Sequence, residues 1–393
     1  MRSQSSGSVS WATASRCSVR QASQHSPIEL DVTGPAVCPG FTRWQASSTP
    51  AQLAAWIELL WGELSAGALG IGVLMGYAPR SGPAEYLAVA RLAAEAGVPM
   101  YTHIRELVEV DATTPVDGAD EVVRAAAETG AAMHHCHVNS TSRRHVDRVL
   151  GSITQARAEG SKVTVEAYPY GAGSTGIGAF FLAPERLAAM GLTPSSLVLL
   201  PSGECIADAA RLREVREQAP GTACIVEFFD EKLPADRKLL HDALAYPDAI
   251  VASDAMPVLW SDGRIESREW PLSAGGSTHP RTAGTFTRAL RTMVRETDTW
   301  SWVEAFRRCS YLPARVLDEV APAAVAKGHL APGADADLVV LDPDVVTDTA
   351  TYLDPTSPSV GVRHLLVAGT PVVRDGALVP DAYPGRPLRG EPK

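Results

Sequence analysis

The segment VPMYTHIRE, residues 98–106, joins a short apolar run to a polar end, and AAMHHCHVNS, residues 131–140, repeats that pattern. Between them, the segment VDGADEVVRAAAETG, residues 116–130, predicts a helix that ends at Gly130. Apolar strands that alternate with helices in this way indicate a parallel sheet covered by helices.

The same alternation continues in both directions along the chain. We predict helices over residues 50–66, 81–97, 140–160, 284–296 and 300–318, and strands within residues 67–79, 162–176 and 249–257. A Ser or Thr N-cap is expected for the helix over 140–160. Residues 171–247 show no clear alternation, so we expect a long irregular insertion there, which could act as a lid over the site.

Two architectures contain such a parallel sheet, a doubly wound open sheet and a closed (β/α)8 barrel. No GxGxxG or GxxxxGK[ST] motif follows a strand, and polar residues cluster at strand ends, where barrels carry their catalytic groups. We therefore expect a TIM barrel over residues 1–320. The tail, residues 321–393, has short β-rich runs and predicts a small C-terminal β-subdomain with a loosely held end from residue 380.

Composition limits the possible partners. The chain has 393 residues, 45% of them hydrophobic, and a formal net charge of −10. This charge argues against binding to nucleic acid or to anionic membranes. Six scattered cysteines fit reduced thiols, and no apolar run is long enough to span a bilayer, so a cytoplasmic protein is expected.

The histidines at the ends of two successive strands are candidate metal ligands. His103 and His137 are 34 residues apart, close to the roughly 31 residues of one βα unit in a barrel, so they should lie side by side. Two imidazoles there could form half of a zinc site, although each could instead bond a backbone carbonyl. Strand alternation places His135 and His137 on one face and His134 and Cys136 on the other.

Other strand ends supply candidates for acid–base chemistry and substrate binding. Asp254 follows the strand within 249–257 and could bind metal or take a proton from water, or could simply be a turn former. Tyr168 and Tyr170 could line a pocket or pack as core aromatics. Arg281 could hold a carboxylate through two hydrogen bonds, or form a surface salt bridge.

In combination, these segments resemble one enzyme family. THIRE, CHVNS, EAYPYGAGST, ASDAMP and HPRTAGTFTR occur in the order seen in the N-acyl-D-amino-acid deacylases (D-aminoacylase and N-acyl-D-glutamate deacylase) of the amidohydrolase superfamily. GHLAPGADADLVVLD and VRHLLVAGTPVVRDG resemble the C-terminal β-subdomain of that superfamily. The resemblance covers about residues 60 to 380, and it implies that His134 and Cys136 are the two that face the helices.

The resemblance implies a metal-dependent hydrolase that cleaves the linear amide of an N-acyl-D-amino acid. His103 and His137 would bind Zn2+, one ion or two, with His135 as an alternative ligand to His137. Asp254 would be the general base, and Arg281 would hold the substrate carboxylate. Two alternatives stay open, a cyclic-amide hydrolase of the hydantoinase or allantoinase type and a catalytically inactive remnant. A homo-oligomer is also left open.

The sequence departs from the family pattern before His103. The superfamily carries an HxH pair at the end of its first barrel strand, and no such pair precedes His103. Lys162 is the first lysine, which excludes a modified lysine from the fourth strand; Cys38 is the candidate for a bridging cysteine. The resemblance therefore implies a barrel that lacks its first strands in this chain.

Overall fold

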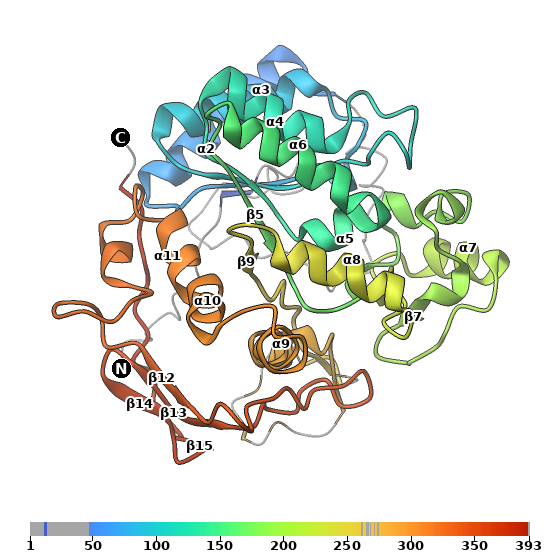
Figure 1. Cartoon of the computed structure of the whole chain (residues 1–393). Coiled ribbons are helices and arrows are strands. Elements are labelled where there is room, and N and C mark those ends of the chain that lie inside the picture. The colour runs from blue at the N-terminus through green and yellow to red at the C-terminus, as the bar shows by residue number, and fades with distance from the viewer. Residues whose placement is uncertain are drawn as a thin grey trace.

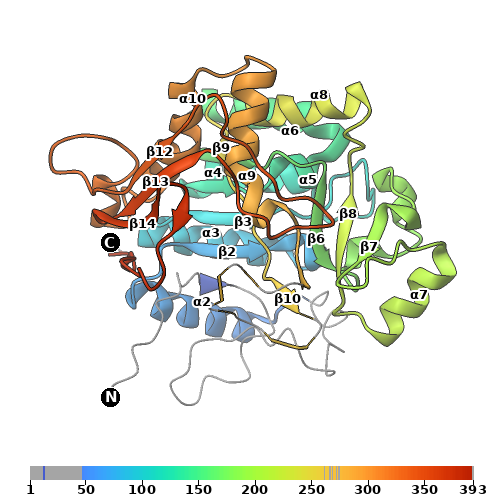
Figure 2. The same ribbon diagram turned by 90° about the horizontal axis from the view of Figure 1, so that it is seen from below.

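The computed structural model describes residues 12–13, 47–260, 262–264, 267, 269–270, 272 and 275–391. Within these residues the chain has an α/β fold with a six-stranded parallel sheet and a four-stranded antiparallel sheet near the C-terminus. Figures 1 and 2 show the C-terminal sheet at one side of the molecule and helix α7 (Ala209–Gln218) at the opposite side. The parallel sheet lies between them.

Every neighbouring pair in the six-stranded sheet is parallel. The strand order follows the order along the chain, without the reversal of a doubly wound sheet. The predicted strands are confirmed, although each is shorter than its apolar run. The strands, in order, are β1 (Ala12–Thr13), β2 (Ile71–Leu74), β3 (Met100–His103), β4 (Met133–His135), β5 (Val163–Ala167) and β9 (Ile250–Val251).

Three helices agree closely with the sequence prediction, namely α2 (Pro50–Ser65), α3 (Pro83–Ala96) and α4 (Gly118–Thr129). Helices α3 and α4 end where expected, at Gly97 and Gly130, whose φ angles of 67° and 74° are left-handed. Glycine adopts this conformation at little cost, so these stop signals act locally and could be found from sequence.

The helix predicted over 140–160 is divided. It consists of α5 (Val138–Ser142), a 3-10 turn and α6 (Val146–Ala158), and Arg143 between them has a φ of 48°. The expectation of a Ser or Thr N-cap is wrong, because His137 and His145 occupy the cap positions and neither side chain caps the helix. The candidate site residue His137 therefore stands at the N-cap position of α5, where a Ser or Thr would ordinarily bond the backbone.

The later helices contain wide turns. Helix α9 (Arg281–Ala289) continues into a π-helical stretch at Leu290–Glu296. Helices α10 (Trp302–Phe306) and α11 (Leu312–Val316) are joined by another π-helical segment. The predictions over 284–296 and 300–318 are thus confirmed as helical, and the first helix begins three residues earlier, at the candidate Arg281.

The segment 171–247 is more regular than expected. It contains an antiparallel sheet with the order β6-β8-β7, followed by helix α8 (Pro234–Ala245). The three strands are β6 (Ala172–Gly176), β7 (Leu197–Leu199) and β8 (Ala223–Glu227). Strands β6 and β8 pair over five residues although almost fifty residues separate them, and a non-local pairing of this kind leaves little signal in the sequence.

The predicted C-terminal β-rich region forms strands β12 (Leu338–Leu341), β13 (Val362–Val367), β14 (Thr370–Arg374) and β15 (Ala377–Leu378). The end of the chain is not loosely held. The backbone N–H groups of Gly390 and Glu391 donate to the carbonyls of Gly67 and Val320. Among the described residues, no helix is both long and apolar enough to cross a lipid bilayer.

One core lies between the parallel sheet and its helices, which Figure 1 shows side by side. Strand residues such as Val73, Met100 and Val165 pack there against helix residues such as Leu64 and Ala93. Full burial of an aliphatic side chain stabilises a fold by about 1.5–3 kcal/mol. This face of the sheet is therefore structural, and the opposite face is left for polar side chains.

Candidate functional site

Side-chain contacts identify the two faces of the parallel sheet. Thr102 hydrogen-bonds the hydroxyl of Tyr86 in helix α3 at 2.8 Å, so Thr102 faces the helices. The β3–β4 register pairs Thr102 with His135, which puts His135 on that same face. His135 is fully buried, and its Nε2 lies 3.1 Å from the Thr141 hydroxyl. His135 therefore lies on the helix-facing side of the sheet.

His134 faces the other way. It pairs with Tyr101, and their ring centroids are 5.1 Å apart. Tyr101 and His103 alternate with Thr102 and so share the face without helices. The expectation that His134 and Cys136 face the helices is wrong, because strand β4 takes the opposite phase and ends at His135.

A turn after β4 then brings His137 to His103. The Cys136 N–H donates to the Thr102 carbonyl at 3.0 Å, and His137 adopts left-handed angles of φ 35° and ψ 58°. This turn ends the strand alternation and directs the His137 ring toward β3. His103 Nδ1 and His137 Nε2 lie 3.1 Å apart, as the spacing of the two strand ends predicted.

The pair fits a tetrahedral zinc ion. Nitrogens about 2.0–2.1 Å from zinc lie about 3.3 Å apart in that geometry, close to the spacing seen here. Burial, and then the neighbouring His137, lowers the pKa of His103 well below 6.5, so the ring is neutral and offers a lone pair. The His137 Nδ1 lies 3.1 Å from the Ser140 hydroxyl, an outer contact that can orient the ring.

A third ligand for the pair is not found in the described part of the chain. The one group of three His, Cys, Asp or Glu donors that comes together among those residues is His134, Cys136 and Glu166, which does not include the pair. Cys38 lies outside the described residues.

Residues that the sequence analysis missed pack around His103. The Tyr77 ring is 5.0 Å from the His103 ring, and Phe181, from the segment 171–247, is 6.2 Å away in a stacked orientation. A Cβ added at Gly76 would overlap the His103 ring. The glycine directly before Tyr77 was the available signal, because glycine often marks a close approach of another group.

The second set of candidates lies at the end of β9. Asp254 follows that strand by three residues and has a left-handed φ of 46°. Its Oδ2 lies 2.8 Å from Nη2 of Arg281, the first residue of α9, as an ion pair. The Arg281 side chain is 1% exposed and that of Asp254 is 34% exposed. The sequence had indicated both residues separately, and the structure joins them as an ion pair.

Arg281 retains capacity for another anion. Its Nε and Nη1 are buried and make no hydrogen bond of ordinary geometry within the described residues. The guanidinium lies 4.7 Å from the centre of the buried Tyr168 ring, a cation–π contact. Burial raises the pKa of Tyr168 to about 12, so its phenol stays neutral.

Tyr77 connects the His103–His137 pair with the Asp254–Arg281 pair. Burial raises the pKa of Tyr77 to about 12, and among the smaller influences are the hydrogen bond from Thr175, the charge of Asp254 and the charge of Arg281. Burial, followed by the carboxylates of Glu166 and Asp254, raises the pKa of the Cys136 thiol well above 9.0. Tyr77, whose ring packs against the His103 ring, is therefore also within reach of the charges of Asp254 and Arg281.

His279 supports Arg281 and was missed, although it stands in the HPR motif. Its Nδ1 accepts the backbone N–H of Arg281 at 3.0 Å, and the ring is buried. Burial, and then the charge of Arg281, lowers the pKa of His279 well below 6.5. The ring is therefore neutral and fixes the start of α9.

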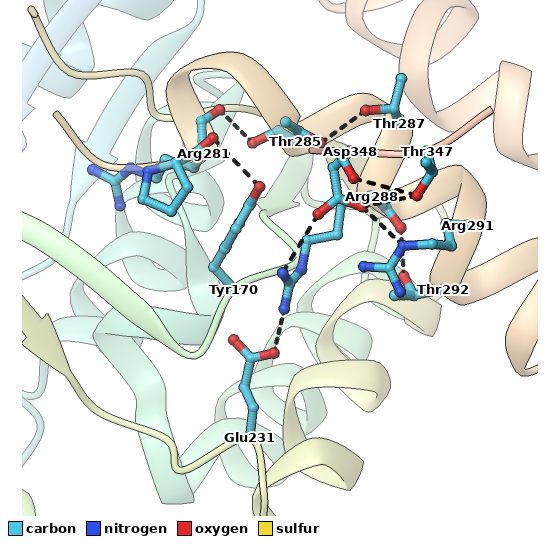
Figure 3. Close-up of polar contacts among 12 residues, drawn as sticks. Tyr170, Glu231, Arg281, Thr285, Thr287, Arg288, Arg291, Thr292, Thr347 and Asp348 are labelled. Carbon is cyan, nitrogen blue, oxygen red and sulfur yellow. Dashed lines mark hydrogen bonds and ion pairs between the residues drawn. The ribbon is translucent and has the colours of Figure 1, made fainter. Parts of the chain in front are cut away.

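Tyr170 lies on the far side of the start of α9, in a second polar network that Figure 3 shows. Its hydroxyl donates to the Pro280 carbonyl at 3.4 Å, and Arg288 stacks 4.3 Å from the centre of its ring. Arg288 is ion-paired with Glu231 and Asp348. A cavity of about 270 Å³ lies beside these residues. Tyr170 thus contacts both Arg288 of this network and the backbone of Pro280, the residue directly before Arg281.

The sequence of the chain is similar to known hydrolases over most of its length. A family model described as the amidohydrolase family matches residues 27–373. The N-acyl-D-glutamate deacylase of Alcaligenes xylosoxydans xylosoxydans is 32% identical over 83% of this chain and 62% of that protein. The D-aminoacylase of the same organism is 28% identical over 85% of this chain and 64% of that protein. The chain thus spans less than two thirds of the length of these curated relatives.

Two solved structures of deacylases have a similar fold to this chain. The N-acyl-D-glutamate deacylase of Bordetella bronchiseptica, crystallised with zinc and a phosphonate mimic of the tetrahedral intermediate, superimposes with a TM-score of 0.66 and 30% identity. A D-aminoacylase structure matches with a TM-score of 0.69 and 23% identity. Each match covers 88% of this chain and 68% of the other.

Proposed function

The chain belongs to the amidohydrolase family, and we propose that it hydrolyses the linear amide of N-acyl-D-amino acids with a zinc ion held by His103 and His137. The observation that carries the proposal is the approach of two imidazole nitrogens, one from each of two adjacent strand ends, to 3.1 Å. In this proposal the parallel sheet is part of a (β/α)8 barrel over residues 1–320, residues 321–393 form the β-subdomain, and Cys38 is the candidate third ligand.

Zinc bound at this pair would supply a Lewis acid that lowers the pKa of water and polarises a carbonyl. Asp254 would take the proton of the attacking water through Oδ1, because its Oδ2 is held by Arg281. The same carboxyl group would then give that proton to the departing amine. The exposed side of Asp254 leaves room for this exchange.

Arg281 would bind the carboxylate of the amino-acid portion. Its Nε and Nη1 are buried and make no hydrogen bond of ordinary geometry in the described residues, and burial strengthens a charge-assisted hydrogen bond to an anion. Tyr168 would hold the guanidinium in place through the cation–π contact. Phe181, close to the His103 ring, supports a role of the segment 171–247 in covering the site.

The test is hydrolysis by the purified full chain loaded with zinc. N-acetyl-D-glutamate, other N-acetyl-D-amino acids, their L enantiomers and a hydantoin are incubated with the protein, and free amino acid is measured. We expect cleavage of the D substrates that is lost in His137→Ala and retained in His329→Ala, a variant of an exposed histidine in the loop before β12. A folded, zinc-loaded protein that cleaves only the hydantoin, or nothing, would refute the proposal.

A further inference from the structure

The face of the sheet that carries His103 also carries a second group of potential ligands. His134 of β4, Cys136 of the following turn and Glu166 of β5 each offer one donor atom, and these atoms all lie within 4.8 Å of one another. The side chain of His134 is 3% exposed and that of Glu166 is 19% exposed. Residues from two adjacent strands therefore converge in a largely buried place.

We propose that His134, Cys136 and Glu166 form a second cation site, distinct from the His103–His137 pair, that takes a transition-metal ion such as zinc. Imidazole, thiolate and carboxylate together suit zinc or cobalt, whereas Ca2+ and Mg2+ favour sets made only of oxygen ligands. Three protein ligands leave a fourth tetrahedral position for water or a substrate group.

The surroundings of His134 can present the required lone pair. Its Nε2 lies 3.0 Å from Glu166 Oε2, and its Nδ1 lies 2.7 Å from the Thr164 hydroxyl. That hydroxyl is also 3.3 Å from the Met133 carbonyl. Thr164 can therefore donate to the carbonyl and accept from Nδ1–H, which leaves Nε2 free to bind a metal. An outer partner of this kind is what metal-binding histidines ordinarily have.

The charge of the group also suits a divalent cation. No Lys or Arg forms an ion pair with Glu166 in the described ranges of the chain, where its close side-chain partner is the His134 ring. Metal binding would release the Cys136 thiol proton to solvent, and the resulting thiolate and the Glu166 carboxylate would balance two positive charges. No redox step or further reactant is needed.

The two metal sites share a turn but no ligand. Cys136 and His137 are adjacent, and the left-handed backbone of His137 directs their side chains to different partners. Substitutions can therefore separate the second site from the pair. This inference does not depend on the proposed deacylase activity, because its readout is metal binding through a thiolate.

The experiment is a Co2+ titration of the full chain followed by absorbance, since a Co2+–thiolate bond gives an intense charge-transfer band in the near ultraviolet. We expect the band in the wild type, in His103→Ala and in Cys224→Ser, which removes another buried thiol. It should be lost in Cys136→Ser. Glu166→Gln should weaken the affinity behind the band by at least about tenfold.

A band that persists in Cys136→Ser would overturn the proposal, as would Co2+ binding to the wild type without any thiolate band. A band that disappears in both Cys38→Ser and His103→Ala but survives in Cys136→Ser would assign the thiolate to the pair instead. Circular dichroism of each variant checks folding. If Cys136→Ser fails to fold, the Glu166→Gln titration decides, and unchanged affinity there refutes the site.

Discussion

The two sides of the candidate site are built alike and charged differently. In both, a residue just beyond a parallel strand has a left-handed backbone, His137 with a φ of 35° and Asp254 with a φ of 46°. His137 faces the His103 imidazole, whereas Asp254 is already paired with Arg281. In the proposed function, the histidine side takes a cation between its two nitrogens. The other is self-neutralised, with spare guanidinium N–H groups for an anion.

Removal of a nitrogen from the histidine side should have the largest effect. His137→Ala leaves one of the two imidazoles, so we expect zinc affinity and kcat/KM to fall by more than the roughly 100-fold typical of losing an outer partner. Metal analysis after dialysis and a zinc titration measure the change. His145→Ala, outside the pair, is the matched control. Zinc binding by His137→Ala that equals that of the wild type would show that the histidine side does not bind the metal through His137.

On the carboxylate side, Arg281→Lys should have the next largest effect. Lysine keeps the charge but loses the planar set of donors, so one charge-assisted hydrogen bond of about 1.5–3 kcal/mol is lost. We expect kcat/KM for an N-acyl-D-amino acid to fall by roughly 10- to 150-fold, mainly through KM. An amide substrate without the carboxylate should lose much less. Equal losses for both substrates would place Arg281 outside carboxylate binding.

Ser140→Ala tests orientation on the histidine side. Its hydroxyl lies 3.1 Å from His137 Nδ1, and outer partners of metal-binding histidines contribute about 10- to 100-fold to affinity. We expect the lower end of that range, because Ser140 also contacts the His137 carbonyl and the α5 backbone keeps the turn. Zinc affinity measured by competition with a chelator gives the number. Ser142→Ala, buried on the same helix, serves as the control.

The smallest effect concerns His279, behind Arg281. Since its folded pKa lies well below 6.5, the unfolded chain binds a proton below pH 6.5 that the folded chain does not, and stability falls as the pH falls. His279→Asn keeps an acceptor for the Arg281 N–H and removes the titration. We expect a flatter loss of unfolding free energy below pH 6.5, by up to about 1.4 kcal/mol per pH unit. Denaturant unfolding between pH 4 and 7 measures it, and parallel curves would contradict the assignment.

Local signals predicted the fold well. The Gly97 and Gly130 stops, the alternation of strands and helices, and the spacing of His103 and His137 all depend on nearby residues or on a regular repeat. These features carry their information within a few residues or one βα unit.

Features that depend on a turn or on distant pairing were not predicted. The phase of β4 and the left-handed His137 decide that His135 is structural and that His134 faces the site, and residue types alone do not reveal that turn. The Asp254–Arg281 ion pair depends on where α9 begins. The β6–β8 pairing joins strands that are almost fifty residues apart, with β7 and α7 between them, and such a non-local pairing leaves little signal in the sequence.

The way the C-terminal end is held matters for handling the protein. Gly390 is hydrogen-bonded to Gly67, and a Cβ at Gly390 would meet the Ala68 carbonyl, so side chains there meet a tight seam. Leu388 packs against the small apolar cluster of Leu69, Ala321 and Ala324. An affinity tag is therefore better joined through a flexible, cleavable spacer than fused rigidly here, because added bulk would press on the Ala68 carbonyl and the Val320 side chain.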